Sequence, residues 1–186
     1  MSGHPARSRA TDRRFYGVAS AIVAEFPEGQ KDDTEEGRVP LRFPWFDPAM
    51  VTLPCRVSQL YAGNGFGSMW RPEVGDEVLV AFVHGDMREP IVLGGLYNGK
   101  DKPFTHPDQD TDQKVLVTKG GHRIIFDDRA KTVTVATKSG TSITLDGDGA
   151  NVTISADAKI TLKARDIELK ADGGDVTIHG QTIRLN

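Results

Sequence analysis

The sequence predicts an all-β protein with two successive regions, a small barrel and then a narrow shaft in which three copies of the chain intertwine. One observation is a change of composition. All ten prolines and both tryptophans lie at or before Pro107, whereas from Asp127 onward there is no proline, aromatic residue, methionine or cysteine. The other is periodicity: β-branched segments bounded by Gly, Pro and Asp come first, and a regular repeat of apolar pairs follows. Both patterns are typical of strands.

Composition excludes several classes of protein. The 186 residues suffice for one ordinary domain or two small ones. The balance of 23 basic and 26 acidic side chains excludes a polybasic nucleic-acid binder and an acidic disordered tail. Cys55 is the only cysteine, so the chain can form no intrachain disulfide or thiolate metal cluster by itself. Neither the apolar core of a signal peptide nor a run of 18 apolar residues is present.

We expect the barrel at residues 15–98, with a flexible arm at 1–14 before it and a polar, turn-rich linker at 99–113 after it. Five segments rich in β-branched and aromatic residues predict its strands: 15–24, 37–43, 55–60, 76–82 and 90–97. Closure into a barrel is favoured because it removes the exposed sheet edges that strands as short as these could not protect.

Glycines mark the turns of this barrel. Gly75-Asp76 is a turn signal before the fourth predicted strand, and Gly85-Asp86 marks the return to the fifth, so the two strands should form a hairpin. Gly94-Gly95 lies within the fifth strand and indicates a bulge or a close backbone approach.

Residues 114–186 form an internal repeat whose unit is a strand of about five residues and a turn. The apolar pairs begin 8.5 positions apart on average, and one residue separates the members of each pair, so both point to one side of their strand. These pairs are the predicted core of the shaft: Val115, Val117, Ile124, Phe126, Val133, Val135, Ile143, Leu145, Val152, Ile154, Ile160, Leu162, Ile167, Leu169, Val176, Ile178, Ile183 and Leu185.

This pattern predicts an oligomer. Two inward side chains make a face only about 7 Å wide, which is too narrow for half of a sandwich. Full burial of an aliphatic side chain stabilises a fold by roughly 1.5 to 3 kcal/mol. A single chain would lose this stabilisation, because its apolar pairs would form a stripe exposed to solvent. Three such sheets can close a triangular prism around a dry axis, so we expect an intertwined homotrimer. A single-chain solenoid is the alternative, but its coils usually need roughly 18 to 25 residues, and no such period is present.

Two linked strings carry a resemblance to a known family. W-R-P-x-x-G-D-E-V-L-V begins at Trp70, and G-D-x-x-x-P-I-V-L-G-x-L-Y-N begins at Gly85. They are accompanied by YGVASAIV, FPWF and KGGHRIIFDD, and then by the Ile/Val–Leu repeat. From about Phe15 to its end, the chain resembles the central spike proteins of contractile injection systems, which are phage baseplate assembly protein V and the VgrG family.

The resemblance implies an OB-fold barrel followed by a triple-stranded β-helix. It also implies a structural, membrane-puncturing function at the baseplate of a phage tail-like particle. The expected partners are two further copies of the chain, a hub protein at the barrel end, a PAAR-type tip cap or effector at the C-terminal end, and the target cell envelope. Assembly would take place in the cytoplasm, without a signal peptide, before the protein joins the particle. Because neither a hub-like domain nor a lysozyme fits around the barrel, we expect the minimal form of spike.

No catalytic, cofactor or metal site is predicted. The five histidines are scattered without metal-ligand spacing, and no serine lies in a nucleophile elbow. Some minimal spikes end in a His-x-His pair that binds iron. Here His179 stands alone and out of phase with the inward Ile178, so we expect it to point outward unless the strand phase breaks at the tip.

Two other functions are compatible with these folds. An OB-fold barrel can bind nucleic acid or polysaccharide, but nucleic-acid binding normally needs a cationic groove, and the sequence through Pro107 has twelve basic and fourteen acidic residues. A receptor-binding tail fibre is also a trimer with a β-helical shaft. Such a fibre is expected to end in a larger globular or aromatic-rich tip, whereas this sequence ends at Arg184-Leu185-Asn186.

Overall fold

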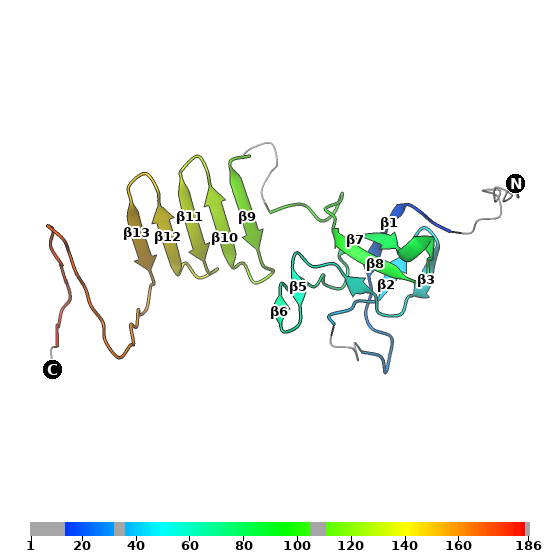
Figure 1. Cartoon of the computed structure of the whole chain (residues 1–186), viewed down its shortest axis with the longest axis horizontal. Helices are drawn as coiled ribbons and strands as arrows, with labels where there is room; N and C mark the ends of the chain where they lie inside the picture. The colour runs from blue at the N-terminus through cyan, green and yellow to red at the C-terminus, as the bar shows by residue number, and fades with distance from the viewer. Residues whose placement is uncertain (1–13, 32–35, 105–110, 185–186) are drawn as a thin grey trace, which may run out of the picture. The chain divides into compact units, whose positions relative to one another are not determined.

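The computed structural model describes residues 14–31, 36–104 and 111–184, and these fall in two compact units divided between Pro103 and Phe104 (Figure 1). All regular elements are strands apart from one short 3₁₀ turn, so the described chain is all-β as predicted. No described helix is long and apolar enough to cross a membrane. The predicted arm lies almost wholly outside the described residues, and the predicted limits of barrel, linker and shaft stay predictions.

The first unit contains a six-stranded sheet in the order β3-β2-β1-β7-β8-β4. Neighbouring strands are antiparallel, except that β4 runs parallel to β8. Two backbone hydrogen bonds between Val39 and Cys55, of 3.0 and 2.8 Å, join the segment before β2 to the segment before β4 and close the barrel. The strands are β1 (Val18–Val23), β2 (Leu41–Phe43), β3 (Asp47–Val51), β4 (Arg56–Val57), β7 (Glu77–Phe82) and β8 (Pro90–Gly95).

The barrel encloses the main apolar core of the described chain. In β7, buried residues alternate with half-buried ones, which is the period of two that a strand with one inward face requires. Phe82 contacts both Phe15 and Phe43 at one part of this core, with ring centroids 5.3 and 5.7 Å away. The buried core residues are Ala21, Val23, Val39, Leu41, Phe43, Cys55, Val78, Val80, Phe82 and Val92.

Three strands of this unit were missed, and one is shorter than expected. The β3 segment reads as a turn because Pro44 and Pro48 flank its start, yet it pairs with β2 as an edge strand, where proline is tolerated. The hairpin of β5 (Ala62–Gly63) and β6 (Phe66–Gly67) lies in a glycine-rich stretch with no apolar alternation. The strand predicted at 55–60 is reduced to β4, which follows the Cys55 bridge.

The predicted hairpin and bulge are both present. Gly75 has a φ of +96° in the turn before β7, and the 3₁₀ turn η1 (Val83–Gly85) connects β7 to β8, which are antiparallel. The β7–β8 register passes from Leu79 opposite Gly94 to Val80 opposite Val92, which leaves Leu93 as the bulged residue. No atom lies within 4 Å of a Cβ placed on Gly94, so the bulge and not a close backbone approach explains the glycine.

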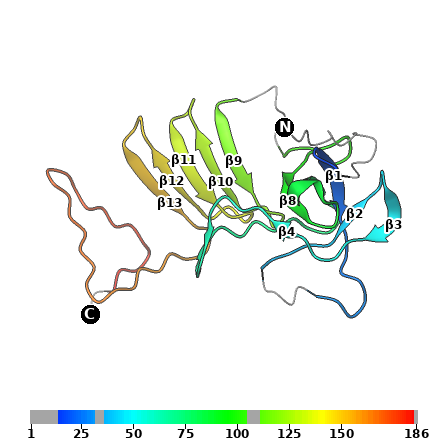
Figure 2. The ribbon, with the colours of Figure 1, turned by 45° about the vertical axis from the view of Figure 1, so that its right-hand side comes forward.

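The second unit begins with a five-stranded antiparallel meander in the order β13-β12-β11-β10-β9, called the ladder below (Figures 1 and 2). Each strand has five residues, and each pairs with the next along the chain. Nine strands were expected, but no strand is assigned in the described residues from 156 to 184. The ladder consists of β9 (Gln113–Val117), β10 (Arg123–Asp127), β11 (Thr132–Ala136), β12 (Ser142–Asp146) and β13 (Asn151–Ser155).

Two turns of the ladder are built alike. After β10, the backbone N–H of Ala130 donates to Asp127 Oδ1 at 2.7 Å, and after β12 the N–H of Gly149 donates to Asp146 Oδ1 at 3.0 Å. Aspartate therefore stabilises both turns through a local side-chain to backbone bond. The last residue of each turn has a positive φ, +53° at Lys131 and +48° at Ala150.

Ala150→Gly is expected to stabilise the ladder by about 0.5 to 1 kcal/mol. The left-handed conformation costs a residue with a Cβ roughly 1 to 2 kcal/mol, and the greater flexibility of unfolded glycine offsets part of the gain. The matched control is Ala130→Gly in the sister turn, because the φ of Ala130 is not positive and glycine there should be neutral or destabilising. Denaturant unfolding of both variants checks this, and a larger gain for Ala130→Gly would contradict it.

Candidate subunit interface

The apolar pairs of four ladder strands lie directly opposite one another. Ile143 of β12 is opposite Val135 on one side and Ile154 on the other, and Leu145 is opposite Val133 and Val152. Residues directly opposite in an antiparallel pair share a face of the sheet. The register thus forms one continuous surface, called the apolar face below, that comprises Leu116, Ile124, Phe126, Val133, Val135, Ile143, Leu145, Val152 and Ile154.

The other face of the ladder is largely polar. Thr134 is opposite Thr144, and their Oγ1 atoms lie 3.3 Å apart. Gln113 Nε2 donates to Asp127 Oδ2 at 2.7 Å. The backbone N–H of Ala130 and then the Gln113 amide lower the pKa of Asp127, because both bonds favour the carboxylate. The sheet therefore has one apolar and one hydrogen-bonded side.

The predicted phase of the first shaft strand is wrong. Ile124 is opposite Leu116, whereas Val115 is opposite Ile125 and Val117 is opposite Arg123. Val115 and Val117 therefore lie on the polar side, and Leu116 takes their place on the apolar face. The error arises because Val-Leu-Val offers three successive apolar residues, among which alternation cannot choose. The turn decides the phase, since the N–H of Thr118 bonds to the carbonyl of His122 at 2.9 Å.

Among the described residues of the single chain, nothing covers the apolar face. Ile143, Leu145 and Ile154 are 46%, 48% and 53% exposed, whereas Val78 and Val80 in the barrel core are fully buried. Among the described residues of the second unit, Ala136 is the one buried apolar side chain. The ladder is a single layer whose large side chains point into solvent, which a stable fold does not leave over so large an area.

In the described part of the chain, the rest of the predicted core pairs with no strand. Every described residue from Asp157 to Arg184 is exposed. Leu185 lies outside the described residues. The seven others of this stretch are more than half exposed: Ile160, Leu162, Ile167, Leu169, Val176, Ile178 and Ile183.

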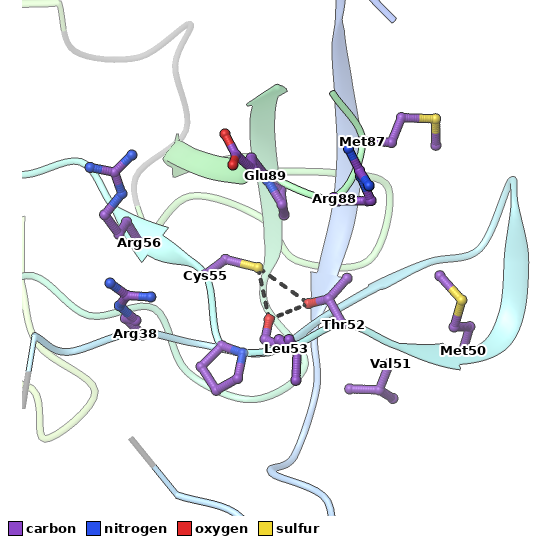
Figure 3. A pocket seen from close by; sticks show the side chains of 12 residues that line it. Arg38, Met50, Val51, Thr52, Leu53, Cys55, Arg56, Met87, Arg88 and Glu89 are labelled. Carbon is purple, nitrogen blue, oxygen red and sulfur yellow. Dashed lines mark hydrogen bonds between the residues drawn. The ribbon is translucent and has the colours of Figure 1, made fainter. Parts of the chain in front are cut away.

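A pocket of about 660 Å³ lies on the barrel beside Cys55 (Figure 3). The Cys55 thiol donates to the carbonyl of Leu53 at 3.0 Å and contacts Thr52 Oγ1 at 3.2 Å. Burial raises the pKa of this thiol, against the opposing effects of the Thr52 hydrogen bond and the Arg38 charge. The thiol is therefore mainly neutral at pH 7 and a poor nucleophile.

Arginines from three segments line the same pocket, and two of them are paired with acids. Arg38 lies 2.7 Å from Glu36, and Arg88 lies 2.6 Å from Asp86. The side-chain hydrogen bond from Arg88 lowers the pKa of Asp86 to about 2. Across the described residues, no three His, Cys, Asp or Glu side chains gather as a metal site would require, and His179 is exposed.

Fold and surface define an all-β protein with an OB barrel and a ladder that has one uncovered apolar face. Residues 22–97 match the family described as the Type VI secretion system/phage-baseplate injector OB domain. Residues 22–97 therefore carry this injector OB domain, and the match and the relatives described next together liken the chain to the phage baseplate protein V and VgrG spike proteins.

Curated relatives agree with the family. The chain is 37% identical over 113 residues to the type VI secretion system spike protein VgrG1a of Pseudomonas aeruginosa, which covers 56% of this chain and 17% of the relative. It is 36% identical over 115 residues to the spike protein VgrG3 of Vibrio cholerae, with 56% and 11% covered. Another relative, from Vibrio cholerae, is the actin cross-linking toxin VgrG1, 36% identical with 56% and 10% covered. The chain thus spans less than a fifth of the length of these relatives.

Proposed function

We propose that the chain is the central spike of a phage tail-like contractile injection system, and that it acts mechanically and without an active site. The apolar face of the ladder carries this proposal. A face of this kind, with exposed Ile, Leu and Val in two continuous rows, is stabilised only when another apolar surface covers it. The comparisons support a place in an injection system, because the relatives of this chain are spike proteins of type VI secretion systems.

Two further copies of the chain are the partners that fit this face. Each strand from β10 to β13 contributes two apolar side chains and β9 contributes Leu116, so the face is about 7 Å wide, and three such faces can enclose a dry axis. Five strands at about 4.8 Å give each face a length on the order of 20 Å. The homotrimer thus buries all three faces against one another.

The segment from 156 to 184 would continue the shaft as a triple-stranded β-helix. Its backbone groups need hydrogen-bond partners, and no strand partner for it is present in the described part of the single chain. The apolar pairs of this segment keep the separation of one residue within each pair, although successive pairs begin 7 to 9 residues apart and not 9 or 10 as in the ladder. Pairing with the equivalent segments of two other chains would bury them and satisfy the backbone. In this proposal the ladder forms within each chain and the following part between chains.

The resemblance to the spike proteins of contractile injection systems implies the proposed partners. A hub protein would bind at the barrel end, a PAAR-type cap or effector at the C-terminal end, and the target envelope would be pierced by the driven needle. Assembly would take place in the cytoplasm. A nucleic-acid role for the barrel is disfavoured because acidic residues outnumber basic ones through Pro107.

Sedimentation of the full chain tests the proposal. We expect the mass of three chains at micromolar concentration, and slow unfolding because the apolar faces must separate before a chain can unfold. A stable, folded monomer would refute the architecture. Electron microscopy of the native particle then distinguishes the alternatives, since a spike lies on the central axis of the baseplate and a fibre at its periphery.

Leu116 and Val117 test the phase of β9. Leu116→Asp should abolish the trimer, because it places three carboxylates against a dry axis. Val117→Asp should change stability by no more than about 0.5 kcal/mol, because Val117 lies on the polar side at the end of its strand. Detergent-resistant trimer on a gel is the measurement. Loss of the trimer in Val117→Asp alone would restore the phase predicted from the sequence.

A further inference from the structure

The turns of the ladder form two rows of opposite charge. Turns after β10 and β12 lie along one side of the ladder, and turns after β9 and β11 lie along the other (Figure 1). This follows from the meander, in which successive strands alternate in direction. The strands are only five residues long, so each side is a compact row of turns and strand ends.

One row, the acidic side, has an excess of carboxylates. Arg129 pairs with Asp112 at 2.8 Å and Lys131 with Asp148 at 2.6 Å. Lys114 is the third basic residue of this row, and its Nζ donates to the carbonyl of Thr111, so all three are bonded within the chain. Five acids against three bases leave two negative charges in excess. The acids of the acidic side are Asp112, Asp127, Asp128, Asp146 and Asp148.

The other row, the basic side, has the opposite sign. It carries Lys119, Arg123 and Lys138, against Asp157, whose carboxylate lies 3.8 Å from the Cβ position of Gly140. Three bases against one acid leave two positive charges in excess. The Lys138 side chain lies against Gly121, with three of its carbons 3.2 to 3.3 Å from the Cβ position, so it connects the two turns of this row.

We propose that the acidic side of one chain docks on the basic side of the next copy of this chain around the shaft. This inference rests on the proposed trimer. In a cyclic trimer of parallel chains every contact is heterologous, so the left side of one sheet always meets the right side of its neighbour. The geometry of the ladder therefore brings the two rows together three times, and their charges are complementary.

The same charges select the direction of the chains. A chain inserted upside down with its apolar face still inward would exchange its two sides, and like-charged rows would then meet. Repulsion of this kind excludes the wrong arrangement, while attraction between the correct sides accelerates the encounter of chains. Both effects act between partly exposed charges and therefore weaken as salt increases.

Charge reversal in the full chain tests this docking. Lys119→Glu/Lys138→Glu reverses the basic side, and Asp128→Lys/Asp148→Lys reverses the acidic side. Asp127 and Asp146 are left intact because they hold the turns. Each double variant should assemble about tenfold more slowly than the parent at 50 mM salt, with the difference reduced at 500 mM. Asp148→Asn controls for loss of the bond to Lys131, and Lys100→Glu/Lys102→Glu in the first unit, after the barrel, controls for net charge; both should assemble at the parental rate.

The quadruple variant that exchanges the signs of both sides is decisive. It should assemble with itself at close to the parental rate but form no mixed trimers when refolded together with a tagged parent chain. If the parent is a trimer while the reversed variants assemble normally, or the quadruple variant mixes freely with the parent, the docking is refuted and the trimer stands. If the parent is a monomer, the trimer itself is refuted and the docking with it.

Discussion

Replacing Ile160 and Leu162 together by aspartate is expected to abolish the trimer and the assembly of particles. Both side chains are more than half exposed in the single chain, so the substitutions remove no interaction within it. In the proposed shaft they face the axis, where the variant would gather six carboxylates from three chains. Ionised groups without partners in a dry interior are strongly disfavoured, and six of them would repel one another.

The neighbouring residues provide the matched control. Thr161→Asp/Lys163→Asp introduces the same groups in the same segment, at positions that the alternation places outward. This change should be tolerated within about 0.5 kcal/mol per chain. The readout is heat- and detergent-resistant trimer on a gel, together with particle assembly. If the Thr161/Lys163 variant lost its trimer and the Ile160/Leu162 variant kept it, the assigned phase of the shaft would be wrong.

Leu41→Ala is expected to destabilise the barrel by about 2 to 5 kcal/mol, the cost of removing a large buried aliphatic side chain. Leu41 is fully buried in β2, the strand that pairs with β1 and β3. It follows closely after Val39, whose bridge to Cys55 closes the barrel. The core residues around Leu41 lie in paired strands, so they can move only slightly into the cavity that the substitution leaves.

Leu60→Ala is the control for this change, because Leu60 is 91% exposed and the same substitution there removes almost no buried surface. Denaturant unfolding followed by tryptophan fluorescence reports on the barrel, since both tryptophans lie in that region. We expect the trimer to persist in Leu41→Ala under conditions where the barrel unfolds, because the shaft forms a separate unit. Equal destabilisation by both variants would contradict the assigned core.

Local chemistry made part of this fold predictable. Gly75-Asp76 and Gly85-Asp86 mark the β7–β8 hairpin through backbone conformations that few other residues adopt, and the hairpin is present. In β11, β12 and β13 a single polar residue separates the two members of each apolar pair, and the register keeps these pairs on one face with Ile124 and Phe126 of β10. The β3 strand was missed because its local sequence is typical of a turn. Its pairing with β2 depends on tertiary structure, which a local pattern does not predict.

The sequence by itself determined the all-β class, the division into two regions of different composition and the apolar rows of the ladder. Each of these depends on patterns among residues only a few positions apart. Only the tertiary structure decided which face Leu116 and Val117 occupy, since the register of β9 depends on its turn and on β10. Only the tertiary structure shows that Val39 and Cys55 close the barrel, because no local sequence pattern predicts that these two segments pair. The opposed charges of the ladder's two sides likewise arise only when the meander brings alternate turns together.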